Sequence, residues 1–107
     1  MAEKVIRVDE VVARVEVMKP PHGDRLVVLA HGEVSSQGWS DAYLAERAPS
    51  PGGDGTYEFD FVATPPTGTV MQVVTPITGV SIVTHLRPNA KMVRVYAREN
   101  SKEQVVH

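Results

Sequence analysis

Two arginines and a tyrosine near the C-terminus have the spacing and chemistry of an anion-binding stripe. Arg94, Tyr96 and Arg98 occupy every second position, and side chains two residues apart on a β-strand lie on the same face. Guanidinium groups bind carboxylate or phosphate, and an adjacent aromatic ring can stack on a nucleobase. The simpler interpretation is that the arginines pair with carboxylates such as Glu58 and Asp60 on a neighbouring strand. An anion or nucleic-acid site is the weaker of the two interpretations.

A second group of residues could line a small-ligand pocket or an active site at one end of a sheet. This group is Trp39 and Tyr43 with His31 or His85. No motif supports catalysis, because Ser40 lacks the second flanking glycine of a nucleophile elbow. A serine, a histidine and an aspartate that lie near one another in sequence do not define a triad without geometry. We therefore expect a protein that is not an enzyme and has no catalytic residues.

The histidines and glycines give little support for a metal or a cofactor. None of the four histidines is paired at the spacing of a local metal site. His31 and Glu33 share a predicted strand face, where a solvated pair is the more ordinary interpretation. The chain has no cysteine, which excludes cysteine-ligated zinc, and the glycine-rich run 52–55 does not match a phosphate-binding loop. We predict neither metal nor cofactor.

Length and charge limit the classes of protein that fit. A chain of 107 residues with 42% hydrophobic residues fits one domain, residues 1–107, with a polar tail at 99–107 that we expect to fray. The 11 basic and 13 acidic residues produce no long-range field that would attract nucleic acid. The charged N-terminus is unlike a signal peptide, and no segment has the roughly 20 apolar residues of a membrane span. We expect a soluble cytoplasmic protein without a membrane partner.

These candidate residues must be positioned by strands, and the clearest strand is Thr56–Val62. Tyr57, Phe59 and Phe61 alternate with Glu58 and Asp60, so the three aromatic rings lie on one face and the two carboxylates on the other. Half of the six aromatic residues of the chain lie on this one face. The pattern predicts the centre of the core.

Three other segments have strand patterns of differing clarity. Residues 4–18 are rich in valine, which favours a strand over a helix, with a bulge or break near Asp9 and Glu10. Segment 25–34 alternates cleanly, and Trp39–Arg47 fits a strand or a short helix equally well. Segment 91–98 is the last clear strand. Its inward residues are Val93, Val95 and Ala97. In segment 25–34, one face carries Leu26, Val28, Ala30 and Val34, and the other carries Val27, Leu29, His31 and Glu33. Both faces of that segment begin with apolar residues, so its first half could be covered on both sides.

Residues 69–84 contain no charged residue and are predicted to form two strands, Thr69–Thr75 and a segment beginning at Ile77. Both faces of this segment are apolar, so both must be covered. A second copy of the chain or a peptide partner that adds a strand could supply one cover.

Six to eight short strands separated by turn signals are typical of an antiparallel β-sandwich. We predict an all-β fold of this type, immunoglobulin-like in architecture, with a small β-barrel as the alternative. The function that these patterns favour is a small non-catalytic binding domain that forms a homodimer or binds a protein partner. Contacts with a ligand or partner are predicted at Trp39, Tyr43, Arg94, Tyr96 and Arg98.

Overall fold

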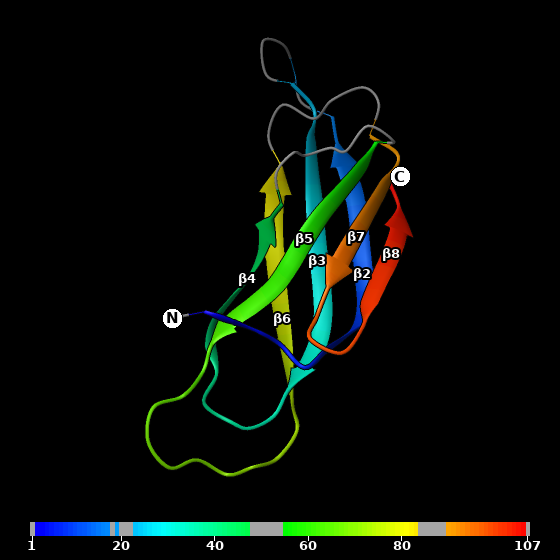
Figure 1. Ribbon diagram of the computed structural model, residues 1–107. Coiled ribbons are helices and arrows are strands. Elements are labelled where there is room, and N and C mark those ends of the chain that lie inside the picture. The colour runs from blue at the N-terminus through cyan, green and yellow to red at the C-terminus, as the bar shows by residue number, and fades with distance from the viewer. Residues whose placement is uncertain (1, 18, 20–22, 48–54, 84–89, 107) are drawn as a thin grey trace.

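A computed structural model describes residues 2–17, 19, 23–47, 55–83 and 90–106, which form strands and connections without a helix. Two sheets pack face to face (Figure 1). The strands are β1 (Glu3–Lys4), β2 (Arg7–Glu16), β3 (Arg25–Val34), β4 (Ser40–Glu46), β5 (Thr56–Thr64), β6 (Thr75–Val83), β7 (Met92–Tyr96) and β8 (Ser101–Val105). This arrangement confirms the predicted β-sandwich, and the two sheets do not close into the alternative barrel.

The larger sheet is built around β5. Both β1 and β4 pair with Val62 of β5, so they lie along opposite edges of that strand. β7 pairs with Thr56–Asp60 in parallel and shares its β5 edge with β1, and β8 continues the sheet beyond β7. The smaller sheet has the order β2-β3-β6 and is antiparallel throughout. The fold is therefore mostly antiparallel, with one parallel pairing among the described strands.

The core lies between the two sheets and is centred on β5, as the alternation predicted. Tyr57, Phe59 and Phe61 are 2%, 0% and 0% exposed. The predicted inward residues of the C-terminal strand, Val93, Val95 and Ala97, are buried beside them. Of the two faces predicted for β3, the one with Leu26, Val28, Ala30 and Val34 is buried. The aromatic face of β5 thus packs against aliphatic residues of both sheets.

The valine-rich N-terminal segment forms strands, as predicted, and its bulge lies where the face of the strand changes. The register of β2 on β3 shifts between Val8 and Glu10, which returns Val11 and Ala13 to the core. The undecided segment 40–47 is a strand, β4. Asp41 has a φ of 52°, and the pairing with β5 shifts between Ser40 and Tyr43. Such an irregularity obscures the period-two pattern.

The predicted strand Thr69–Thr75 is wrong, because most of that segment is an irregular connection. β5 ends at Thr64 in the larger sheet and β6 begins at Thr75 in the smaller one, so the chain must cross between sheets here. The crossing packs on the turn after β3: Gln37 N–H donates to the Met71 carbonyl oxygen at 3.2 Å. A Cβ on Gly38 would lie 2.9 Å from the Pro66 Cβ. Pro76 lies at the start of an edge strand, one of the positions expected of a proline.

The polar segment after Arg98, where we expected a tail, contains β8, which pairs with β7 along its whole length. The turn signals in Pro20–Asp24, Ala48–Gly55 and Arg87–Ala90 fall largely on residues 20–22, 48–54 and 84–89, which lie outside the described residues, as does His85. The described residues include no helix that is long and apolar enough to cross a membrane.

Candidate functional site

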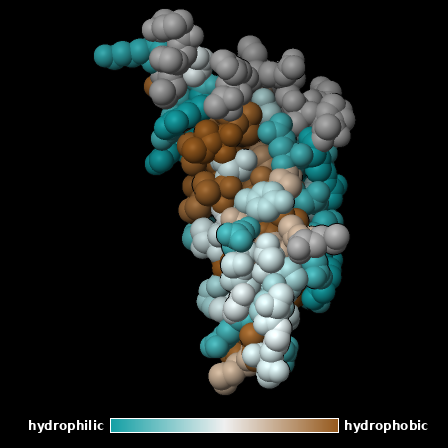
Figure 2. Space-filling model, turned by 90° about the vertical axis from the view of Figure 1, so that its left-hand side faces the viewer, coloured by the Kyte–Doolittle hydropathy of each residue, from teal (hydrophilic) through white to brown (hydrophobic). Residues whose placement is uncertain are grey.

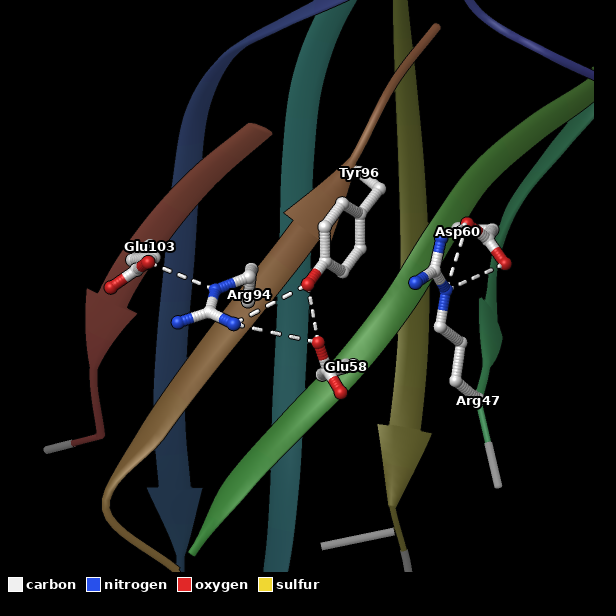
Figure 3. Close-up of polar contacts among 6 residues, drawn as sticks. All are labelled: Arg47, Glu58, Asp60, Arg94, Tyr96 and Glu103. Carbon is white, nitrogen blue, oxygen red and sulfur yellow. Dashed lines mark hydrogen bonds and ion pairs between the residues drawn. The ribbon is translucent and has the colours of Figure 1, made fainter. Parts of the chain in front are cut away.

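Arg94 and Tyr96 lie on the outer face of the larger sheet and are held by acidic residues of both neighbouring strands (Figure 3). Arg94 Nε donates to Glu103 Oε1 at 2.9 Å, and Arg94 Nη1 lies 3.5 Å from Glu58 Oε2. The Tyr96 hydroxyl donates to Glu58 and accepts from Arg94 Nη1 at 3.3 Å. Hydrogen bonds to Tyr96 and Glu103 raise the pKa of Arg94. The guanidinium is therefore occupied by partners within the chain.

Asp60 is the centre of a second group on the same face. Arg47 follows β4 and binds this carboxylate in a fork, with Nη2 2.7 Å and Nε 3.1 Å from Oδ1. Lys4 Nζ lies 3.4 Å from the same oxygen. The Arg47 guanidinium also lies over the Tyr96 ring, 3.9 Å from its centre, and joins the two groups. The hydrogen bond from Arg47 is the main reason that the pKa of Asp60 lies below its usual value.

The two groups form one polar network, consisting of Lys4, Arg47, Glu58, Asp60, Arg94, Tyr96 and Glu103. It contains three cations and three carboxylates, and each charge has a partner of opposite sign within the network. Such an arrangement stabilises a solvent-facing sheet and offers no excess of positive charge to an anion. The geometry favours the simpler of the two interpretations of the arginine stripe.

Arg98 is separate from the polar network. It lies beyond the end of β7 with an exposed side chain, and its backbone N–H donates to the Val5 carbonyl oxygen at 2.9 Å. The expected partnership of Glu58 with Arg94 is present, whereas Asp60 is bound by Arg47 and Lys4. Sequence reasoning missed Arg47 because the structure of segment 40–47 was undecided.

Replacing Asp60 with asparagine tests the electrostatic part of the network. We expect Asp60→Asn to lower the free energy of unfolding at pH 7 by about 1–2 kcal/mol, the range for a charge-assisted bond that is partly exposed. Because folding depresses the pKa of Asp60, its contribution is complete above the unfolded value of about 3.9 and is lost as pH falls through the lower folded value. Urea unfolding of both proteins should show a difference that is constant above about pH 5 and closes in acid.

Asp24→Asn is the control, since Asp24 is exposed and outside the network. It should leave stability within about 0.5 kcal/mol of the parent. An Asp60→Asn protein as stable as the parent at pH 7 would show that the charge of Asp60 contributes nothing to stability.

The predicted pocket residues lie on different surfaces of the sandwich. Tyr43 pairs with Val62 on the outer face of the larger sheet and is 46% exposed. His31 lies on the outer face of the smaller sheet, where its Nδ1 is 2.9 Å from Thr78 Oγ1. Trp39 is half-buried against the core, and its Nε1 is buried with no hydrogen-bond partner among the described residues. The structure therefore does not bring His31 together with Tyr43.

His31 and Glu33, which share a face, bind different residues. Glu33 is paired with Arg7, and His31 Nε2 lies 3.9 Å from a Glu10 oxygen. Within the described ranges, no three histidine, aspartate or glutamate side chains lie close enough to hold a metal ion.

The outer face of the smaller sheet carries an apolar patch. Cross-strand pairing places Val12, Leu29 and Val80 in one row, and Val27 beside Ile82 in the next. Val12, Val80 and Ile82 are 44%, 48% and 52% exposed, and the other two are half-buried. We call these five residues the apolar patch. Figure 2, which faces the side with β4 and β6, shows hydrophobic surface gathered in the upper half of the molecule and hydrophilic surface on both flanks.

Polar and charged residues border the apolar patch along the strands. Glu10 and His31 lie beyond the row that contains Val12, and Arg14 lies beside Val27. The sequence predicts that both faces of segment 69–84 must be covered. It does not show that Val12 and Leu29 extend the same apolar surface, because strand order cannot be read from the sequence.

Comparison of the chain with models of protein families, with curated proteins and with solved structures gave no match.

Proposed function

We propose that this protein is a small non-catalytic binding domain that self-associates through the apolar patch. The observation that carries the proposal is the contiguity of five aliphatic side chains across all three strands of the smaller sheet, three of them about half exposed. Scattered apolar residues are ordinary on a protein surface, whereas a contiguous group with a polar border is typical of an interaction site.

The contrast between the two outer faces supports this proposal. The charges of the polar network pair with one another, so the outer face of the larger sheet is suited to contact with solvent. The apolar patch on the smaller sheet has no comparable cover among the described residues. Burying the exposed half of a valine or isoleucine side chain contributes about 1 kcal/mol of favourable free energy. This contribution favours association.

Two other functions have less support. Nucleic-acid or anion binding through Arg94, Tyr96 and Arg98 would require the network to release Arg94 from two carboxylates. A pocket that combines Tyr43 with His31 would have to join opposite outer faces.

We also propose a cytoplasmic location, which the absence of cysteine supports. We propose in addition an immunoglobulin-like architecture, which the two packed, mostly antiparallel sheets support.

Sedimentation velocity over a wide range of protein concentration tests self-association. We expect the weight-average mass to rise from that of a monomer toward that of a dimer as concentration increases. The midpoint should change little with salt, because the patch carries no charge and apolar contacts are not screened. A monomer mass at every concentration would overturn the proposal.

A further inference from the structure

The four long sheet edges differ in how well they are protected against pairing with another chain. β2 carries five charged residues and a bulge, β8 carries Lys102 and Glu103, and β4 has a bulge and a positive φ at Asp41. Charges and bulges are the usual means by which edge strands avoid pairing. β6 has neither, and it is the one strand of the eight described without Asp, Glu, Lys or Arg.

β6 is also long enough and regular enough to accept a further strand. It pairs with β3 over all nine residues without a register shift, and β3 is its one strand partner among the described residues. β4 crosses the inner side of β6, where a Cβ on Gly79 would lie 3.4 Å from the Tyr43 carbonyl carbon. The outward-facing residues Thr78, Val80 and Ile82 are exposed. Pro76 removes one donor, at the start of the strand.

We infer that β6 pairs antiparallel with β6 of a second copy across a two-fold axis, which joins the two smaller sheets into one sheet with the order β2-β3-β6-β6-β3-β2. This inference rests on the proposed self-association and specifies its geometry. A two-fold axis places the same strand on both sides of the new pairing. Because β6 is uncharged, this pairing puts no like charges opposite one another.

The alternation of side chains restricts the register of the new pair. Residues directly opposite in an antiparallel pair point to the same face, so each outward residue of β6 must face an outward residue of its partner. Two central registers satisfy this rule and join the exposed aliphatic side chains. In one, Val80 faces Val80 of the partner subunit, and in the other Val80 faces Ile82 of the partner subunit. Either register makes the two apolar patches continuous.

Charge explains why a second copy fits this edge better than another segment of the chain. A strand added beside Val80 and Ile82 should bring apolar outward side chains and no charge to an apolar surface. Every other described strand contains at least one charged residue. Among the described strands, β6 of a second copy is therefore the best partner for the β6 edge.

The limited area of the patch supports edge pairing over simple contact between faces. Three half-exposed residues from each copy would contribute about 6 kcal/mol on full burial, which is comparable with the 4–15 kcal/mol or more lost in association. Apolar contact alone therefore leaves little surplus. Edge pairing buries only the sides of Val80 and Ile82 that face the added strand and leaves Val12 exposed, so backbone hydrogen bonds along β6 supply most of the stabilisation and fix the orientation.

Two lysine substitutions within the apolar patch distinguish this geometry from a dimer joined face to face. Ile82 lies on the β6 edge and Val12 on β2, two strands away, and the two are similarly exposed. For β6 pairing, Ile82→Lys should weaken dimerisation about tenfold or more by introducing like charges beside the two-fold axis. Val12→Lys should leave the dimer within about twofold of the parent, with circular dichroism confirming that both variants are folded.

The outcomes separate the geometry from the proposed function. Equal weakening by both substitutions would overturn edge pairing while leaving association through the patch intact. A dimer that neither substitution weakens would overturn both, and a protein that is monomeric at every concentration would overturn both as well.

A distance measurement provides an independent test that does not depend on weakening the dimer. The chain has no cysteine, so Arg14→Cys introduces a single site for a spin label on β2. Five strand spacings and the offset along the strands place the two Arg14 positions about 25–30 Å apart in the edge-paired dimer. Face-to-face packing permits a separation near the 10 Å spacing of stacked sheets. A separation below about 15 Å between the Arg14 backbones would overturn edge pairing.

Discussion

Replacing Phe59 with alanine should cost about 3–5 kcal/mol of unfolding free energy, as expected for a buried phenylalanine. Phe59 is fully buried, pairs with Val95, and lies between Tyr57 and Phe61 on the inner face of β5. Truncation removes ring contacts with both sheets and leaves a cavity that the paired backbone cannot close. Domains of this size are stable by only about 5–15 kcal/mol, so the loss is a large fraction of the total.

Urea unfolding monitored by circular dichroism measures this loss, and Tyr43→Ala is the matched control. Tyr43 belongs to the same sheet but is 46% exposed on the outer face, so its loss should cost less than about 1 kcal/mol. Similar costs for the two substitutions would mean that the aromatic face of β5 is not the core. The unfolding slope should be unchanged in both variants, because the surface exposed on unfolding is nearly the same.

Replacing Gly32 with alanine should also be severely destabilising, by about 3 kcal/mol or more, which is the upper range for overpacking. Gly32 lies on β3 opposite Val8, at the β2 bulge. A Cβ on Gly32 would overlap the carbonyl oxygen of Arg7. That oxygen belongs to the backbone of a paired strand, so relief requires the two strands to separate locally.

Gly79 offers a comparison in which the obstacle is a side chain. A Cβ on Gly79 would lie 2.8 Å from Phe61 Cε1. Gly79→Ala should therefore destabilise less when combined with Phe61→Leu than the two single costs predict, because the smaller side chain makes room. Phe61→Leu should not rescue Gly32→Ala in the same way, since the Arg7 oxygen remains. Thermal unfolding of the single and double variants gives both interaction energies, and rescue of Gly32→Ala would contradict the assigned overlap.

Gly32 and Gly79 both lie where a neighbouring atom leaves no room for a Cβ. Both lie on the smaller sheet, on strands that pair with each other, and both are next to Phe61. The sequence shows only glycines inside strand patterns, which indicate a bulge or a close approach of some kind. Which atom approaches each glycine is known only when the two sheets are packed.

Segments whose structure depends on their own alternation were predictable from the sequence. The period-two pattern identified the core face of β5 correctly and separated the two faces of β3, and the face change near Glu10 located the bulge. β4 was ambiguous because Asp41 and its bulge interrupt the pattern. β8 was not predicted because its residues are mostly polar and it is held in place by pairing with β7.

The segment 69–75 shows where local preference fails. Its valines and threonines favour a strand, but a strand requires a partner edge. This segment connects two different sheets, and the crossing leaves most of it irregular. Its exposed Met71, Val73 and Val74 show that an apolar composition did not ensure burial.

By itself, the sequence determined the all-β class, the identity of the core face of β5 and the absence of charge from β6. These properties follow from side-chain alternation and composition, which are local. Tertiary structure alone decided that Arg47 binds Asp60, that Val12 and Leu29 join Val80 in one patch, and that β6 is an edge. Strand order and register decide these relationships because they bring together residues far apart in the chain, and no local pattern encodes that choice.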